Sequence, residues 1–222
     1  MIKLSDLKKS LGLTLVVALV ISGFFVFAEP IATQAANPST VVVTLSVTAG
    51  VSLTVDNVTS PMSTAISVSQ NTAVATSTFV VSTNDYLGYT LKLNASTTAP
   101  AMQSASSTIP DVTTTPTLYA SLLPANSYGF GFSAYSTTSP ADVPTGTWGT
   151  QTAGCANGAN TPSTGLKYRG FAGNTQITVA SNAATTTPAG TAVVVCYVAG
   201  QNNSYIPSGS YTATITATAT TN

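Results

Sequence analysis

The side chains able to carry out catalysis are few in this chain. It contains no histidine, which removes Ser-His-Asp and Cys-His catalysis and nearly all zinc sites. Beyond residue 35 its acids are Asp56, Asp85, Asp111 and Asp142. Glycosidase chemistry needs two carboxylates within about 10 Å, and a calcium site needs several at short intervals. We predict no enzyme activity, metal site or cofactor, and expect these aspartates to serve turns.

Two cysteines and one lysine are the other reactive candidates. In an exported chain, the pair Cys155 and Cys196 predicts a disulfide. It would close a loop of roughly 40 residues and stabilise the fold by about 4 kcal/mol in the chain-entropy model. A redox pair is the alternative, but it usually has Cys-x-x-Cys spacing. Lys92 is the candidate for an intramolecular Lys–Asn isopeptide bond, with an outward-facing strand lysine as the simpler interpretation.

Aromatic residues in the loops could stack on sugar rings, although core packing would use the same side chains. The aromatic residues that could do so are Trp148, Tyr128, Tyr135, Tyr168 and Tyr205, and the candidates singled out for ligand contact are Trp148, Tyr135 and Tyr168. Candidate glycosylation sites are the residues that match the Asn-x-Ser/Thr acceptor pattern: Asn57, Asn94 and Asn202.

The N-terminus predicts export. Three lysines precede an uncharged apolar run at 11–28, and Thr33-Gln34-Ala35 provides a small-x-small cleavage site. Residues 1–35 therefore read as a signal peptide that is cut between Ala35 and Ala36. A retained membrane anchor is the alternative, because the run is of borderline length for a membrane span.

Charge is scarce in the exported part. From Ala36 onward there are three basic and four acidic side chains, a net charge of −1. Binding to nucleic acid needs several Lys or Arg on one face, and docking on anionic lipid needs a basic cluster. We therefore expect no nucleic-acid partner and no membrane contact beyond the signal segment.

The last residues show the clearest periodicity. From residue 210 to residue 220 apolar side chains alternate with threonine, the pattern of a strand with one buried and one solvent-exposed face. This alternation predicts that the exported domain is complete at Asn222, with the last strand inside the fold.

Other segments of the same period, separated by Gly, Pro and Asn, predict further strands. They cover 41–47, 51–55, 76–83, 89–96, 128–133, 167–171, 175–180 and 191–199. We expect 76–83 and 89–96 to form a hairpin, Gly129 and Gly131 to admit a close neighbour, and long loops near 96–126 and 136–165. The prediction is one all-β domain over 36–222, an antiparallel β-sandwich of Greek-key or immunoglobulin-like type, preceded by the signal helix.

Three parts of the chain together resemble a known group: 43–47 with 51–55, 80–84 with 88–91, and 207–216. The set is similar to uncharacterised exported β-sandwich proteins of the Patescibacteria, which pair a "TTN…GYTL" hairpin with a closing "P-x-G-x-Y-T-x-T-I-T" strand. This resemblance implies an extracellular surface protein and supplies no activity. The closing strand also resembles WxL-type cell-wall-binding domains, but Trp148 is followed by Gly149-Thr150, so peptidoglycan binding is not implied.

We therefore expect a non-catalytic structural or adhesive protein of the cell surface, with further copies, other surface proteins or glycans as partners. Strand-forming sequence begins about five residues after the cleavage site, an arrangement that would suit a pilus-like filament built by strand complementation between copies. Pairing of 41–55 within its own domain is the alternative, and it is the interpretation that we favour for this segment. The second candidate function is a carbohydrate- or cell-wall-binding module that uses exposed loop aromatics.

Overall fold

The computed structural model describes residues 44–96, 98–150, 154–156 and 160–222. Residues 47–222 form one compact unit, and the fold described below is that of this unit. The predicted signal peptide, its cleavage site at Ala35 and Ala36, and residues 41–43 lie outside the described ranges. Within these ranges, no helix has both the length and the apolar character that a membrane span requires.

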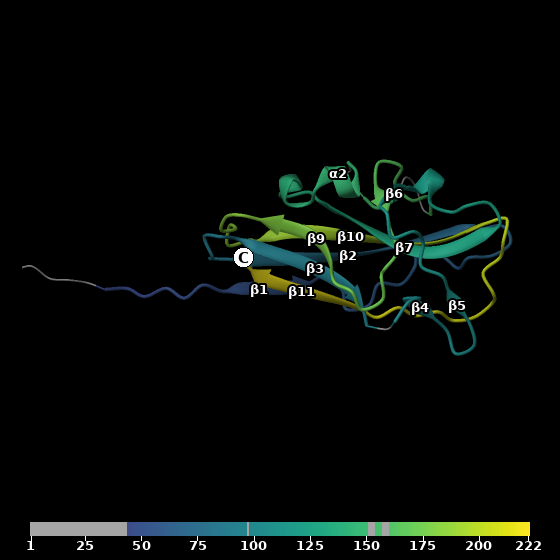
Figure 1. Ribbon diagram of the computed structural model, residues 1–222, viewed down its shortest axis with the longest axis horizontal. Helices are drawn as coiled ribbons and strands as arrows, with labels where there is room; N and C mark the ends of the chain where they lie inside the picture. The colour runs from purple at the N-terminus through teal and green to yellow at the C-terminus, as the bar shows by residue number, and fades with distance from the viewer. Residues whose placement is uncertain (1–43, 97, 151–153, 157–159) are drawn as a thin grey trace, which may run out of the picture. The chain divides into compact units, whose positions relative to one another are not determined.

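The described residues form two main antiparallel sheets (Figure 1). The four-stranded sheet has the order β1-β2-β10-β7, and the three-stranded sheet has the order β11-β3-β9. Their bounds are β1 Val51–Val55, β2 Thr72–Thr83, β3 Tyr89–Ala95, β7 Ser127–Ser136, β9 Ile177–Asn182, β10 Thr191–Asn202 and β11 Ile215–Thr221. The predicted all-β class and antiparallel sandwich are confirmed.

The strand order differs from that of an immunoglobulin constant domain, although both have four and three strands in their main sheets. In the immunoglobulin order the fifth strand lies between the second and the fourth. Here the sixth main strand along the chain, β10, lies between β2 and β7 among the described residues. The chain therefore changes sheet between β9 and β10, and again between β10 and β11.

The predicted hairpin of 76–83 with 89–96 is wrong, because β2 and β3 belong to different sheets. The connection is a corner: the Asp85 carboxylate accepts the N–H of Leu87 at 3.0 Å, and Gly88 has a φ of 85°. A Cβ at Gly88 would overlap the backbone of Asn182. The turn residues therefore cross the roughly 10 Å between packed sheets instead of reversing within one.

The main core lies between the inner faces of the two sheets. Its largest members have essentially no exposed surface: Trp148, Tyr89, Phe130, Phe132, Phe171, Leu91 and Leu93. The Phe132 and Phe171 rings stack with centroids 4.2 Å apart, so aromatic contacts add to the area buried.

A second apolar cluster covers the outer face of the four-stranded sheet. It joins Val74, Cys196 and Val198 on the sheet to Leu122, Leu166 and Tyr168 on the covering segments. The predicted long loops supply this layer through Leu122 and Cys155, whereas their Met102 and Ile109 belong to the main core. The elements described in these loops are short: β4 Met102–Gln103, β5 Thr108–Ile109, β6 Thr117–Leu118, η1 Tyr119–Ser121, η2 Pro140–Asp142 and α2 Thr145–Trp148, followed by β8 Lys167–Tyr168. Because both faces are covered, β10 is buried on both sides from Val195 to Gln201.

The glycine face predicted on β7 is confirmed. A Cβ at Gly131 would lie 2.8 Å from the carbonyl oxygen of Arg169 and 2.6 Å from a methyl of Val112, and a Cβ at Gly129 would also meet Val112. Glycine at both positions therefore lets the covering segments pack directly on the strand.

Candidate assembly site at the open edge of the sandwich

Two of the four aspartates hold turns and strand ends. Asp85 accepts the N–H of Leu87, and Asp56 accepts the N–H groups of Asn57 and Thr78 through Oδ1. Slight burial opposes ionisation of Asp56, but the hydrogen bonds outweigh it and lower its pKa. The predicted turn role is confirmed for these two residues.

The other two aspartates point into the protein. Asp142 accepts the hydroxyl of Tyr89 at 2.9 Å, and burial together with this negative charge raises the pKa of Tyr89. Asp111 accepts the N–H of Ala101 at 3.2 Å, and burial raises the pKa of Asp111 to about 6. The described residues contain no group of three or more His, Cys, Asp or Glu placed to hold a metal ion.

The three aromatic residues singled out for contact with glycans are buried, so the prediction is wrong for these three. Trp148 is 1% exposed and Tyr168 is 0% exposed, while Tyr135 is 6% exposed. The Trp148 ring packs against Phe132 with centroids 5.3 Å apart. Large apolar rings stabilise a core strongly, and all three side chains belong to the two apolar clusters described above.

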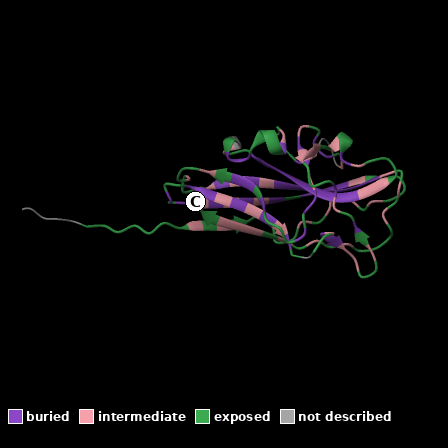
Figure 2. Cartoon of the chain, viewed as in Figure 1, coloured by how far each residue is buried: buried purple, intermediate pink, exposed green. Residues whose placement is uncertain are grey.

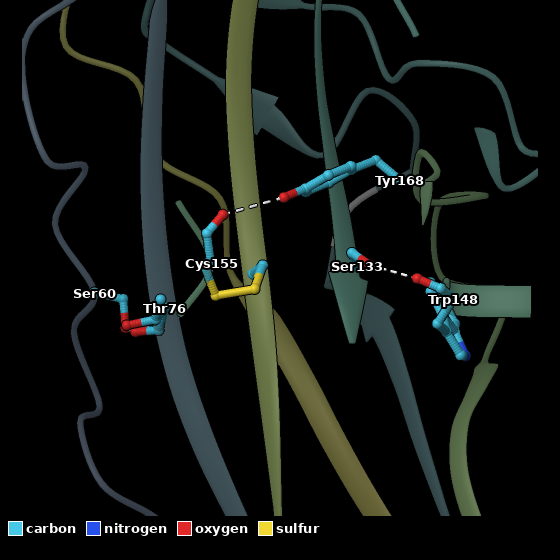
Figure 3. Close-up of a disulfide and its surroundings, with 7 residues drawn as sticks. Ser60, Thr76, Ser133, Trp148, Cys155 and Tyr168 are labelled. Carbon is cyan, nitrogen blue, oxygen red and sulfur yellow. Dashed lines mark hydrogen bonds between the residues drawn. A yellow bond between two sulfur atoms is a disulfide. The ribbon is translucent and has the colours of Figure 1, made fainter. Parts of the chain in front are cut away.

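The predicted disulfide between Cys155 and Cys196 is confirmed (Figure 3). Cys196 lies on β10, and Cys155 lies on the covering segment; both are buried. The Tyr168 hydroxyl donates a hydrogen bond to the carbonyl oxygen of Cys155 at 3.3 Å. The disulfide therefore fastens an irregular segment to a central strand of the four-stranded sheet.

The remaining residues singled out from the sequence lie at the surface or close to it. Asn57 is exposed, whereas Asn94 and Asn202 are half-buried and donate from their amides to backbone carbonyls. Lys92 pairs across the sheet with Thr178 and Thr218. Its cross-strand neighbours are therefore threonines, where an isopeptide bond would need an acid.

One side of the sandwich is closed by hydrogen bonds. Phe132 on β7 exchanges two backbone hydrogen bonds with Arg169, at 2.8 and 2.9 Å. Phe130 donates to the carbonyl of Pro110 and accepts from Val112. These contacts cover the outer edge of β7.

The opposite side is open. β1 pairs on one side with β2, and β11 pairs on one side with β3; no further strand pairs with either among the described residues. The side chains of Leu53 on β1 and of Ile215, Ala217 and Ala219 on β11 face the core but stay half-buried. Figure 2 shows β1 and β11 as pink and green strands beside the purple central strands.

The backbone pattern identifies which peptide groups are free on the edge of β11. Ser96 donates to Thr214 and Asn222 donates to Gly88, so the even-numbered residues of β11 direct their N–H and C=O groups at β3. In an antiparallel pair these groups alternate in direction. Ile215, Ala217 and Ala219 therefore direct their unpaired peptide groups at the open edge, in the plane of the sheet, while their side chains face the core.

The free edge of β1 follows the same rule. Asn84 donates to Gly50, and Asp56 donates to Thr78, so the even-numbered residues face β2. Val51, Leu53 and Val55 are left with unpaired peptide groups on the open side.

A groove of about 740 Å³ lies where these two edges end, lined by the last residues of β1, the segment 57–62 and the chain from Tyr211 to Ala217. Its apolar lining includes Phe79, Phe130, Tyr197, Leu53, Ile215 and Ala217. No lining residue is charged. Tyr197 is neutral at physiological pH, as an ordinary tyrosine is, and burial raises its pKa further, to about 12.

The groove opens because β1 is shorter than its partner. β1 pairs only with Phe79–Thr83 of the 12-residue β2. Beyond it, the chain stays near β2 through separate hydrogen bonds. The Ser60 Oγ donates to the Thr76 carbonyl at 2.8 Å (Figure 3), and the Ser63 N–H donates to the Val74 carbonyl at 2.7 Å. This irregular stretch borders β2 in place of a strand, and its Pro61 and Met62 line the groove together with Ala75 and Phe79 of β2.

Comparison with known proteins identifies no relative. No protein-family model matches the chain, no curated protein matches it, and no solved structure matches it. The resemblance drawn from sequence to Patescibacterial surface proteins therefore stays a prediction, and the groove is interpreted from its own chemistry.

Sequence reasoning did not identify the groove. Its signal was present in the inward-facing positions of the last strand, where alanine at 213, 217 and 219 replaces the larger residues of other strands. Small inward residues leave space between two sheets unless something else fills it.

Proposed function

We propose that this chain is an exported, non-catalytic structural protein of the cell surface that assembles into filaments through β-strand complementation between copies. The observation that carries the proposal is the neutral apolar groove between the unpaired edges of β1 and β11. Open edges with an apolar inner face are the sites at which an added strand completes a sheet.

Two further observations support an extracellular setting. The disulfide between Cys155 and Cys196 suits an oxidising compartment, and the sequence begins with a signal-like segment. Glycan binding, the alternative drawn from the sequence, loses the three contacts singled out for it because Trp148, Tyr135 and Tyr168 are buried, and it keeps Tyr205 as an exposed candidate.

A pair of neighbouring substitutions on β11 tests this function. We expect Ala217→Glu to abolish assembly, because its carboxylate would enter the apolar groove, where an unpaired charge is costly. Thr216→Glu is the matched control, since Thr216 is exposed and lies on the other face of the same strand. Electron microscopy and light scattering of the chain from Ala36 measure assembly. Circular dichroism with thermal unfolding checks that both variants are folded. Strictly monomeric wild-type protein at high concentration, or assembly of a folded Ala217→Glu variant, would contradict the proposal.

A further inference from the structure

We propose that the groove is filled by residues 41–47 of a second copy, laid along the free edge of β11 with Val41, Val43, Leu45 and Val47 facing inward. This inference rests on the proposed function and adds the identity of the partner segment. Each copy then accepts one strand at its open edge and donates one from its N-terminal side.

The first argument is the match between donor and groove. Residues 41–47 alternate Val, Val, Leu and Val with Val, Thr and Ser, and 31–55 contain no charged residue. The groove lining also carries no charge. A strand with one fully apolar face is what an apolar groove between two sheets would bury.

The second argument is length and backbone pairing. The donor has seven residues and β11 has seven, roughly 23 Å of extended chain at about 3.3 Å per residue. Among the described residues no strand pairs with the peptide groups of Ile215, Ala217 and Ala219 on that edge, and Ala217, which lines the groove, leaves room for a larger donor side chain. A paired donor therefore satisfies backbone groups and fills space at once.

The third argument concerns the state of the donor in its own chain. The predicted pairing of 41–55 within its own domain is confirmed for Val51–Val55, which pairs with β2. Residues 44–50 form no strand, and Val47 is 72% exposed. An apolar, strand-forming segment of this kind is left available for pairing with another copy.

The junction at 48–50 favours a second copy as acceptor. The Asn84 amide donates to the carbonyl of Thr48 at 2.9 Å, and Asn84 Oδ1 accepts the N–H of Gly50 at 2.7 Å. The Thr83 hydroxyl also donates to the Gly50 carbonyl at 2.8 Å. To enter the groove of its own copy, the donor segment would have to reverse direction within Thr48–Gly50. The hydrogen bonds to Asn84 and Thr83 oppose that reversal, because they fix the backbone of this stretch in its present conformation.

Cross-linking between two separately produced variants tests the assignment. One copy carries Leu45→Cys; the other carries Ile215→Cys, Ala217→Cys or Ala219→Cys. Because a disulfide forms only when the two Cα atoms lie within about 7 Å, we expect reducible dimers from at least one mixture. Leu45→Cys mixed with Thr216→Cys is the matched control and should give several-fold less dimer. The native cysteines are buried in their own disulfide and do not compete.

The outcomes separate the two proposals. Absence of cross-linking in every mixture while the wild-type chain assembles would overturn the donor assignment and leave assembly standing. A Leu45→Cys plus Ala217→Cys double variant that closes as a monomer at high dilution would overturn the assignment to a second copy. A wild-type chain that never assembles would contradict the proposed function itself.

Discussion

Replacing both cysteines, Cys155→Ala with Cys196→Ala, is expected to lower the free energy of unfolding by about 4 kcal/mol, the value the chain-entropy model gives for a loop of this length. The bond joins positions 41 residues apart in sequence. It also holds the covering segment on β10, where Cys196 and Val198 are completely buried. Urea unfolding with and without the disulfide measures the loss.

A control separates the cross-link from lost packing. Val198→Ala removes buried carbon atoms from the same apolar cluster and leaves the disulfide intact, so we expect a smaller loss. If the double cysteine variant lost no more stability than Val198→Ala, the disulfide would add nothing beyond its contacts.

The second large effect is expected at the centre of the main core. Phe132 is 0% exposed and packs against Phe171 and Trp148, with ring centroids 4.2 and 5.3 Å away. Phe132→Ala should cost about 3–5 kcal/mol, because the surrounding rings cannot collapse fully into the space left. Denaturant titration followed by the fluorescence of Trp148 measures the change.

The matched control is an aromatic residue at the surface. Tyr86 is 78% exposed at the corner between the sheets, and Tyr86→Ala should change the stability by no more than about 0.5 kcal/mol. Similar losses for both variants would mean that the packing around Phe132 is not the origin of the stability.

The strand positions could be predicted because the alternation of apolar and polar residues in the sequence matches the alternation of inward and outward side chains in the folded strands. In β11, Ile215, Ala217 and Ala219 face inward, while Thr216 and Thr220 are exposed. β3 and β10 also lie where their period-2 patterns place them. Local alternation contains this information, since it follows from the geometry of a single strand.

The sheet to which each strand belongs could not be predicted from the same pattern. β2 and β3 are neighbours in sequence with a turn between them, yet they lie in opposite sheets. A hairpin and a corner between sheets use similar turn residues, and the choice depends on partners far along the chain, such as β10 and β11. Such long-range pairing leaves no local signal.

The same limit explains why neither the burial of the loop aromatics nor the groove could be predicted from the sequence. The sequence places Trp148 in an irregular stretch, where an exposed ring and a core ring look alike. It also predicts an apolar face on the last strand, but alternation does not say whether that face is covered. The unpaired state of that edge follows only from the strand order, in which β11 ends the described three-stranded sheet β11-β3-β9.

The most direct test of strand addition at the edge of β11 is hydrogen exchange measured residue by residue in the dissociated and the assembled chain. The amides of Thr216 and Thr218 face β3 and should be protected in both forms. We predict that the amides of Ala217 and Ala219 exchange rapidly in the dissociated chain and become protected on assembly. Equally fast exchange of these two amides in both forms would contradict the account.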